Sequence, residues 1–207
     1  MGLKGKFITL EGAEGSGKST QGALIYAYLK SKKKKVLLIR EPGGVKISGS
    51  IRHVLLDVKN KQMTKECETL LYMAARSQLV AEVIVPALEK GHIVLCDRFL
   101  DSTIVYQGYG NGVDIDFIKK LGRFATQGVQ PDLTLLFDIE TKKGLSRKGK
   151  IKDRIELRPL AYHNRVRQGY LELAKAEPRR IKVIKVDRSK EEIFAIVRRS
   201  IDRLADL

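Results

Sequence analysis

The most distinctive group of residues in this chain runs from Gly12 to Thr20. It fits the spacing G-x-x-x-x-G-K-[ST], in which a glycine-rich loop cradles phosphate groups. Glycines let consecutive backbone N–H groups turn inward as a concave anion site. The members of this predicted phosphate-binding loop are Gly12, Ala13, Glu14, Gly15, Ser16, Gly17, Lys18, Ser19 and Thr20.

The segments on either side of the loop fit the same interpretation. Residues 7–10 form an apolar, strand-like run, and residues 21–30 have a helical pattern. A helix that begins at the loop directs its free N–H groups and positive dipole end at the phosphates. Lys18 would then reach the β and γ phosphates of a nucleotide, and the Ser19 hydroxyl would ligate Mg²⁺. The alternative is a glycine-rich turn before a helix, which the order strand, loop, helix disfavours.

Two more apolar runs end in charged residues. Residues 36–39 lead into Arg40-Glu41-Pro42-Gly43-Gly44, and residues 93–96 lead into Asp97-Arg98-Phe99. In open α/β sheets, ligands bind at the carboxyl ends of the strands. Asp97 is therefore expected to hold Mg²⁺, and the planar guanidinium of Arg98 to clamp a phosphate. Each segment alone also fits an ordinary surface loop with solvated charges or a salt bridge.

Residues 65–90 have a mostly apolar helical pattern, which Pro86 is expected to kink or divide. Tyr72 and Arg76 are four residues apart and share one face of this helix. Arg76 lies in an apolar context, so it needs a partner if it is buried. It can equally extend its charged end to solvent, and the pattern alone does not decide between a ligand-binding and a solvated arginine.

Residues 147–156 form a basic stretch that contains Arg147, Lys150 and Arg154. If the stretch is helical, these three side chains share one cationic face. Gly149 weakens such a helix, which favours a mobile segment over a packed one. A mobile basic segment suggests a lid over phosphates that excludes water. A solvated charge run is the alternative.

Five apolar runs alternate with helical segments along the whole chain. The predicted strands are residues 7–10, 36–39, 93–96, 133–138 and 181–186. This alternation predicts a three-layer α/β/α fold, the P-loop NTPase fold, with a five-stranded parallel sheet. We expect one domain, residues 1–207, with a small mobile lid at about 142–157.

Composition places the chain among ordinary globular proteins, except for its charge. Apolar residues make up 43% of it, and no signal-peptide segment or run of about 18 apolar residues is apparent. The two cysteines, Cys67 and Cys96, form no metal or disulfide pattern, so we expect a reduced, cytoplasmic protein without a membrane partner. The net charge of +16 fits nucleic acid, an anionic surface or anionic small substrates. The lysine-rich residues 30–35 are interpreted as a solvated turn, because no aromatic residues alternate with the lysines.

The chain resembles the thymidylate kinase family over nearly its whole length. The matching motifs are Glu11-Gly12-Ala13-Glu14-Gly15-Ser16-Gly17-Lys18-Ser19-Thr20, Arg40-Glu41-Pro42-Gly43-Gly44, Ala74-Ala75-Arg76, Asp97-Arg98-Phe99, Tyr106-Gln107-Gly108 and Asp153-Arg154-Ile155-Glu156. The resemblance implies conversion of dTMP and ATP to dTDP and ADP with Mg²⁺ in dTTP biosynthesis. It also implies a homodimer.

The resemblance further implies a role for individual residues. Glu14 would contact the deoxyribose 3′-hydroxyl, and Arg98 would hold the dTMP phosphate near the γ-phosphate. Arg76 would hydrogen-bond the thymine edge, on which Tyr72 would stack. The remaining residues implied around the substrate are Glu41, Arg52, Thr103, Tyr106 and Gln107.

An acidic residue before Gly15 resembles the bacterial branch of the family, in which the lid supplies the catalytic arginine. Arg147 and Arg154 are both candidates, because the lid here is short and rich in lysine. The chain departs from the family pattern at three positions. Tyr72 stands where many members have phenylalanine, Val45 replaces a common threonine, and Phe99 replaces a common tyrosine.

Three alternative functions fit the sequence less well. A guanine-reading GTPase is disfavoured, because residues 60–63 lack the aspartate of N-K-x-D and no D-x-x-G occurs. A nucleoside monophosphate kinase of other base preference is disfavoured by Arg76 and the loop at 106–108. A nucleic-acid-binding P-loop ATPase is suggested only by the positive charge, so a nucleic acid partner is not expected.

Overall fold

A computed structural model describes residues 3–147, 149 and 153–205, and its centre is a parallel β-sheet. The strands are β1 (Lys6–Glu11), β2 (Val36–Arg40), β3 (Ile93–Asp97), β4 (Leu133–Asp138) and β5 (Ile181–Lys185). Their order in the sheet is β2-β3-β1-β4-β5, with β1 in the middle. The three central strands, β3, β1 and β4, are mostly apolar and buried because helices cover both of their faces, whereas the edge strands β2 and β5 are partly exposed. The predicted five-stranded α/β fold is confirmed.

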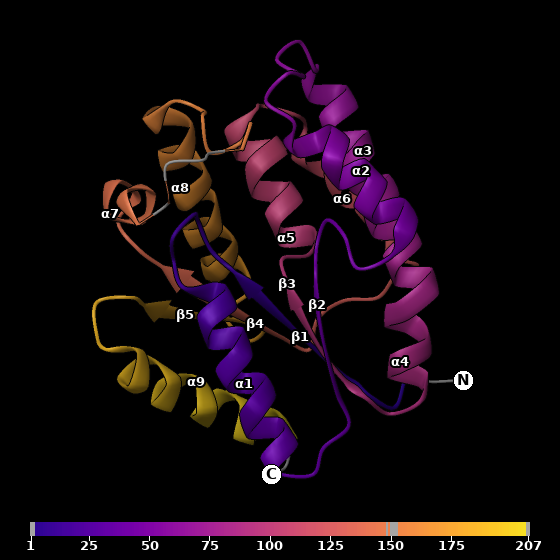
Figure 1. Cartoon of the computed structure of the whole chain (residues 1–207), viewed down its shortest axis with the longest axis vertical. Helices are drawn as coiled ribbons and strands as arrows, with labels where there is room; N and C mark the ends of the chain where they lie inside the picture. Colours follow the sequence, from indigo (N-terminus) through magenta and orange to yellow (C-terminus); the bar gives the residue numbers. More distant parts are fainter. Residues whose placement is uncertain (1–2, 148, 150–152, 206–207) are drawn as a thin grey trace.

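Two helices cover one face of the sheet. They are α1 (Lys18–Ser31) and α9 (Lys190–Ala205), which lie side by side in Figure 1. Ile25 and Leu29 of α1 and Val197 of α9 pack against Ile8 and Leu10 of β1 in a fully buried cluster. This layer fixes the start of α1 directly beyond the carboxyl end of β1.

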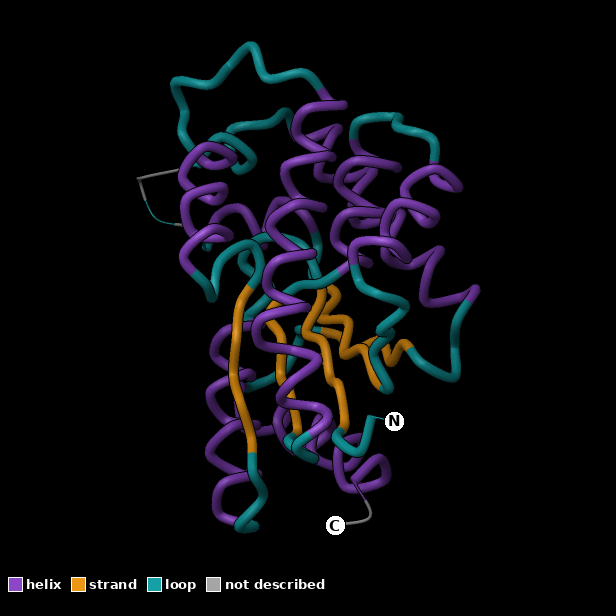
Figure 2. Tube along the Cα trace, turned by 90° about the vertical axis from the view of Figure 1, so that its right-hand side faces the viewer, coloured by secondary structure: helices purple, strands orange, loops and turns teal. Residues whose placement is uncertain are grey.

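Most of the other helices, together with two π-helical segments, cover the opposite face. They are α2 (Lys46–Leu56), α3 (Lys65–Leu79), η1 (Val80–Ile84), α4 (Val85–Glu89), α5 (Leu100–Thr103), η2 (Ile104–Gly110), α6 (Ile115–Ala125) and α8 (Leu160–Ala176). The short helix α7 (Thr141–Ser146) follows β4. Figure 2 shows that much of this helical layer extends beyond the strand ends, where it can surround a ligand.

The helix predicted for residues 65–90 is divided near Pro86, as expected, and the two parts are joined by a π-helical segment. Helix α3 ends at Leu79, η1 follows, and Pro86 occupies the first turn of α4. A proline lacks the N–H of a regular helical bond, so the backbone changes its pattern just before it. By length and composition alone the combined segment Lys65–Glu89 could cross a membrane, although it contains no run of about 18 apolar residues. Such a helix also occurs inside soluble proteins, and this one carries the paired charges described below.

The expected lid is only partly described. Helix α7 covers its beginning, Asp153 to Glu156 form its end, and Lys150 lies outside the described residues. The expected helical face through Lys150 therefore has no structural description.

Candidate active site

The phosphate-binding loop joins β1 to α1, as its sequence predicts. Gly12, Gly15 and Gly17 all have positive φ angles, of 140°, 68° and 84°, which residues with a side chain rarely adopt. A Cβ at Gly12 would also collide with the carbonyl of Phe137, and one at Gly15 with the carbonyl of Gly144. The loop is therefore held between β4 and α7; both conformation and space require Gly12 and Gly15, whereas conformation alone favours glycine at position 17.

The Lys18 side chain folds back over this loop. Its Nζ donates to the carbonyls of Gly12 at 2.8 Å and Ala13 at 2.9 Å, and to Ser16 Oγ at 3.2 Å. Burial lowers the pKa of Lys18 to about 7, and the charge of Arg98 adds to this effect. Phosphate oxygens placed in the loop would offer Nζ charged acceptors in exchange for neutral ones.

Ser19 and Asp97 are adjacent at the mouth of the loop. Ser19 Oγ donates to Asp97 Oδ2 at 2.9 Å, although the two residues belong to α1 and β3. Mg²⁺ prefers oxygen ligands and usually takes one or two from protein, with water and phosphate completing its shell. The pair fits that requirement, and no cluster of three or more metal-binding side chains occurs in the described part of the chain.

A cavity of about 500 Å³ opens beside the loop, at the carboxyl ends of the strands. Most of the residues predicted from sequence line it. These are Glu14, Gly15, Ser16, Gly17, Lys18, Ser19, Thr20, Glu41, Arg52, Tyr72, Arg76, Asp97, Arg98, Thr103, Tyr106, Gln107 and Arg147. Gly12 and Ala13, at the start of the loop, do not line the cavity, but their carbonyls accept hydrogen bonds from Lys18; Arg154 does not line the cavity either.

Arg98 lies at the centre of the polar contacts. Its backbone has a left-handed φ of 76°, an uncommon conformation for a non-glycine residue and one associated with functional sites. The guanidinium lies over the ring of Tyr106, 4.9 Å from its centroid. It donates to the Gly12 carbonyl (3.1 Å), Ser102 Oγ (3.2 Å), Tyr170 Oη (3.2 Å) and Glu14 Oε1 (3.1 Å).

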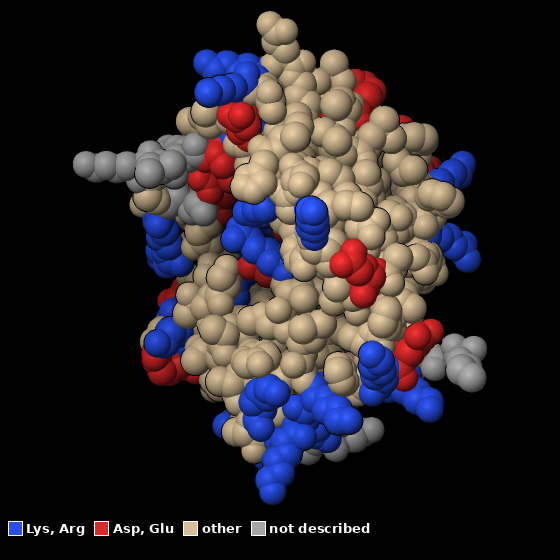
Figure 3. Space-filling view, turned by 45° about the vertical axis from the view of Figure 1, so that its right-hand side comes forward, with Lys and Arg blue, Asp and Glu red and all other residues tan. Residues whose placement is uncertain are grey.

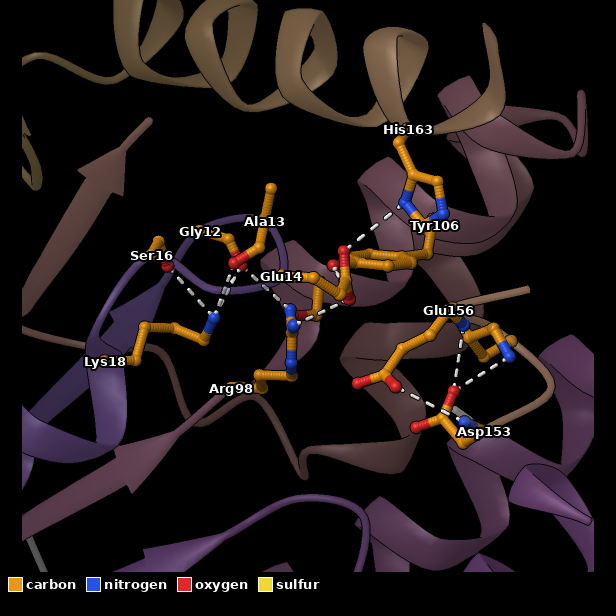
Figure 4. Close-up of polar contacts among 12 residues, drawn as sticks. Gly12, Ala13, Glu14, Ser16, Lys18, Arg98, Tyr106, Asp153, Glu156 and His163 are labelled. Carbon is orange, nitrogen blue, oxygen red and sulfur yellow. Dashed lines mark hydrogen bonds and ion pairs between the residues drawn. The ribbon is translucent and has the colours of Figure 1, made fainter. Parts of the chain in front are cut away.

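Glu14 extends from the loop toward helix α8. Its Oε1 accepts a hydrogen bond of 2.6 Å from Tyr106, and its Oε2 lies 3.4 Å from Nδ1 of His163 (Figure 4). Burial opposes ionisation of Glu14, but His163, Arg98 and Lys18 together hold its pKa well below the usual range. A buried carboxylate is thus available at the wall of the cavity.

The opposite wall contains a buried ion pair. Arg76 Nε donates to Glu41 Oε2 at 2.8 Å, and both side chains are almost fully buried. Arg76 also donates to Thr103 Oγ1 at 2.9 Å and to the Phe99 carbonyl at 3.0 Å. Arg76 is therefore not a solvated arginine, and its fixed guanidinium faces the cavity beside Tyr72.

Arg147 and Arg154 lie in different surroundings. Arg147 is exposed at the cavity, where it donates to the Gly15 carbonyl at 3.4 Å. Arg154 is only 7% exposed and bonds to the Leu55 carbonyl and to Glu68, 2.6 Å away. The expected shared cationic face is wrong for Arg154, because the buried carboxylate of Glu68 holds it inside the protein.

Several polar residues of the site were given no role from the sequence. Glu68 binds Arg154 and Arg158 and accepts bonds from Gln107 and Asn111. Glu11 is fully buried and accepts bonds from the Phe99 N–H, Ser102 and Tyr170. His163, Asp153 and Glu156 also lie at or near the cavity. These residues come together only through tertiary packing, although the position of Glu68 one turn before Tyr72 was a usable hint.

This arrangement defines a class of protein. A parallel sheet, a phosphate-binding loop, a serine and aspartate at its mouth, and a cavity lined by arginines are the parts of a P-loop phosphotransferase. The sequence model of the family described as thymidylate kinase matches residues 10–197. The chain belongs to the thymidylate kinase family.

Individual relatives agree over nearly the full length. The chain is 44% identical to a thymidylate kinase of Symbiobacterium thermophilum, over 96% of this chain and 93% of that protein. It is 48% identical to a thymidylate kinase of Halothermothrix orenii, over 92% and 93%. A crystal structure of thymidylate kinase from Ehrlichia chaffeensis superimposes with a TM-score of 0.80 at 34% identity, covering 95% of this chain and 98% of that one.

Proposed function

We propose that this enzyme phosphorylates dTMP to dTDP with ATP as the donor, as a step in dTTP biosynthesis. The observation that carries the proposal is one cavity shared by a phosphate-binding loop and a second wall built from Tyr72, Arg76 and Arg98. The phosphate-binding loop suits a nucleoside triphosphate, and the wall opposite suits a second nucleotide, with an aromatic ring for its planar base and arginines for its polar groups. Membership of the thymidylate kinase family selects dTMP as the acceptor.

In the proposed reaction, an oxygen of the dTMP phosphate attacks the γ-phosphorus of ATP. The bond from that phosphorus to the β–γ bridging oxygen breaks, and ADP leaves with this oxygen. Lys18 and the loop N–H groups would hold the donor, and Arg98 would hold the acceptor phosphate in line with it. Catalysis in this class rests on positioning and charge neutralisation. When bound by Ser19 and Asp97, Mg²⁺ would neutralise phosphate charge.

Arg147 is the proposed catalytic arginine of the lid. It is exposed at the cavity and reaches the loop carbonyl of Gly15, on the side where the donor phosphates would lie. Arg154, by contrast, is proposed to anchor the end of the lid through Glu68. The exposure of Arg147 at the cavity and the burial of Arg154 against Glu68 are the basis of these two roles.

The remaining proposed contacts concern the nucleoside. Tyr72 would stack on thymine, Arg76 would hydrogen-bond its edge, and Glu14 would accept from the deoxyribose 3′-hydroxyl. Glu41 fixes Arg76, and Gln107 is fixed by Glu68, so these walls are held in place without ligand. The remaining proposed contacts, with the phosphate-acceptor side and the nucleoside pocket, are Arg52, Thr103 and Tyr106.

We infer that the positive charge serves anionic nucleotides and not nucleic acid. Among the residues that the structure describes, six cationic side chains line the cavity: Lys18, Arg40, Arg52, Arg76, Arg98 and Arg147. On the face shown in Figure 3, lysines and arginines form separate groups, the largest at the lower end and some of the others beside acidic residues, and no continuous basic stripe crosses this face. A polynucleotide groove would require such a stripe.

We further propose a cytoplasmic homodimer without membrane insertion. Cys67 and Cys96 are both free thiols, which fits a reducing compartment. Helix α3 buries Glu68 and Arg76 as paired charges inside the fold, which disfavours a lipid-spanning role. Exposed apolar side chains on α2, α3 and α6 support self-association: Ile47, Val54, Leu70, Phe117 and Phe124.

The function is tested by measuring ADP release from ATP and Mg²⁺ with dTMP, dUMP, UMP, CMP, AMP or GMP in turn. We expect strong dependence on dTMP and slower turnover of dUMP, since one methyl group is worth about 1–3 kcal/mol in a pocket. Lys18→Ala serves as the inactive control and should remain folded. Preference for another monophosphate would show that Tyr72 and Arg76 do not recognise thymine as proposed. Stimulation of ATP hydrolysis only by polynucleotide would favour a nucleic-acid ATPase.

A further inference from the structure

The two carboxylate oxygens of Glu14 have unequal surroundings. Oε1 accepts from the hydroxyl of Tyr106 at 2.6 Å and from Arg98 at 3.1 Å. Oε2 is buried and has no hydrogen-bond partner among the described residues. Leaving a buried charged oxygen without a donor costs free energy. The nearby Nδ1 of His163, 3.4 Å away, is placed to be that donor.

The buried ring of His163 also lacks hydrogen-bond partners in the part of the chain that the structure describes. Its side chain is 1% exposed, and neither ring nitrogen has a hydrogen-bond partner within the described chain. The ring packs edge-on against Tyr162, with centroids 5.4 Å apart, and projects from α8 toward Glu14 in Figure 4. A neutral imidazole carries one N–H, on either nitrogen. Placing it on Nδ1 would give a partner to Nδ1 of His163 and to Oε2 of Glu14.

We propose that His163 is a positioning residue, which donates from Nδ1 to Glu14 Oε2 and holds the carboxylate turned toward a ligand hydroxyl in the cavity. His163 does not line the cavity, whereas Glu14 does. It therefore acts through Glu14. The inference rests on the proposed function, in which that hydroxyl is the 3′-hydroxyl of dTMP.

Orientation of the carboxylate is what His163 contributes. Arg98 and Lys18 both attract Glu14 from the side of the phosphate-binding loop. With His163 removed, only the Tyr106 hydroxyl would oppose their pull. A carboxylate drawn toward the loop no longer presents a free lone pair to the sugar. We expect recognition of the 3′-hydroxyl to weaken about tenfold, the scale of one hydrogen bond to a charged group.

The first experiment observes the histidine directly. The chain has three histidines, so a long-range ¹H–¹⁵N spectrum of the wild type and of His163→Asn assigns the His163 imidazole by difference. We expect the Nδ1–H tautomer, with an Nδ1 resonance that shifts in Glu14→Gln. An Nε2–H tautomer in the folded wild type would overturn the proposal, whatever the enzyme's substrate is.

The second experiment compares kcat/KM for dTMP with kcat/KM for 2′,3′-dideoxythymidine monophosphate, which lacks the 3′-hydroxyl. We expect His163→Phe to lower the ratio of these two values about tenfold by acting on dTMP alone. His163→Asn, which keeps a donor near the Nδ1 position, should restore most of the ratio. His92→Asn is the matched control, because His92 lies at the opposite end of β3 and should change nothing.

The outcomes separate this inference from the proposed function. If Glu14→Gln collapses the ratio and the folded His163→Phe variant does not, the positioning role is wrong while the contact of Glu14 with the sugar stands. If Glu14→Gln leaves the ratio unchanged, Glu14 does not read the hydroxyl and both assignments are wrong. If the wild type does not turn over dTMP, the proposed function is wrong, and the tautomer alone decides the pairing of His163 with Glu14.

Discussion

Arg147 and Arg154 show how the surroundings of a side chain decide its role. Both are arginines in one basic stretch, yet one is exposed at the cavity and the other is buried against Glu68. An arginine that stabilises a transferring phosphoryl group must reach the reacting atoms. One that pairs with a fully buried carboxylate is needed for the fold. Substitution by alanine should therefore affect different measured quantities at the two positions.

For Arg147→Ala we expect kcat to fall by about 10³–10⁵-fold with KM for ATP changed much less. The contact is proposed to form mainly in the transition state, so its loss acts on kcat. Steady-state kinetics with both substrates measures this, and an unchanged melting temperature serves as the control for folding. A variant with wild-type kcat would show that Arg147 only belongs to a solvated surface.

For Arg154→Ala we expect the free energy of unfolding to fall by about 3 kcal/mol, the scale for breaking a buried ion pair. Glu68 is fully buried and would keep only Arg158 as a cationic partner. Urea unfolding measures the loss, and Arg158→Ala is the matched comparison because its side chain is more exposed and lies farther from Glu68, at 3.3 Å. A stable Arg154→Ala variant with a collapsed kcat would reverse the assignments of the two lid arginines.

Glu41 makes the stability of the folded protein depend on pH. Burial raises the pKa of Glu41 from 4.5 to about 7, against the opposing charge of Arg76. The folded state then binds this proton more tightly than the unfolded state does. The associated stability is complete below pH 4.5 and is lost as pH rises through about 7. Glu41→Gln should therefore show a smaller fall in melting temperature between pH 5 and 8 than the wild type, and parallel curves would contradict this.

At the scale of elements, the phosphate-binding loop depends on a close contact with α7. The backbone of Gly15 lies against the carbonyl of Gly144, and a Cβ on Gly144 would meet the carbonyl of Glu14. Two glycines in different elements thus allow the loop and the first part of the expected lid to touch. The contact places Arg147, at the end of α7, next to the loop.

For Gly15→Ala we expect both weaker ATP binding and a lower melting temperature. The alanine would face a collision with a backbone carbonyl in addition to an unfavourable positive φ. Gly128→Ala isolates the second effect, because Gly128 has a similar φ of 76° but open space at its Cβ. Calorimetric titration of a nonhydrolysable ATP analogue measures the loss. Equal effects of the two substitutions on binding would mean that the contact with α7 is unimportant.

The sequence predicted elements well and tertiary contacts poorly. The five strands, the phosphate-binding loop and the break near Pro86 follow from local patterns, namely apolar runs, glycine spacing and a missing N–H. The loop residues and the charged ends of β2 and β3 converge because parallel strands align their carboxyl ends. His163 gave no such signal, and Glu68 gave only its spacing from Tyr72, since the residues that surround each of them come from other elements. Likewise, nothing local distinguishes a buried Arg154 from an exposed Arg147.

At the scale of the whole molecule, one helical face is unusually apolar. Exposed apolar side chains on α2, α3 and α6 include Ile47 (53%), Leu70 (54%), Phe117 (52%) and Phe124 (82%). Helix α2 packs against α3 and α3 against α6, so the three helices form one layer. Apolar side chains gathered in this way usually mark an interface. A second copy of the chain packed on this layer would cover the apolar side of the segment Lys65–Glu89, which is only partly buried within one copy. Such packing would explain why the segment is so apolar.

For Leu70→Glu we expect the proposed homodimer to dissociate into monomers. A glutamate at this position places a charge on the apolar face of α3, and a second copy could then pack there only by desolvating it. Sedimentation velocity should show wild-type protein at twice the chain mass of 23.3 kDa and the variant at that mass. Val183→Glu is the matched control, because Val183 is 45% exposed on β5, which packs against α8 and α9 and away from the proposed face. A wild type that is monomeric at micromolar concentration, or a Leu70→Glu variant that stays dimeric while Val183→Glu dissociates, would place the interface elsewhere or remove it.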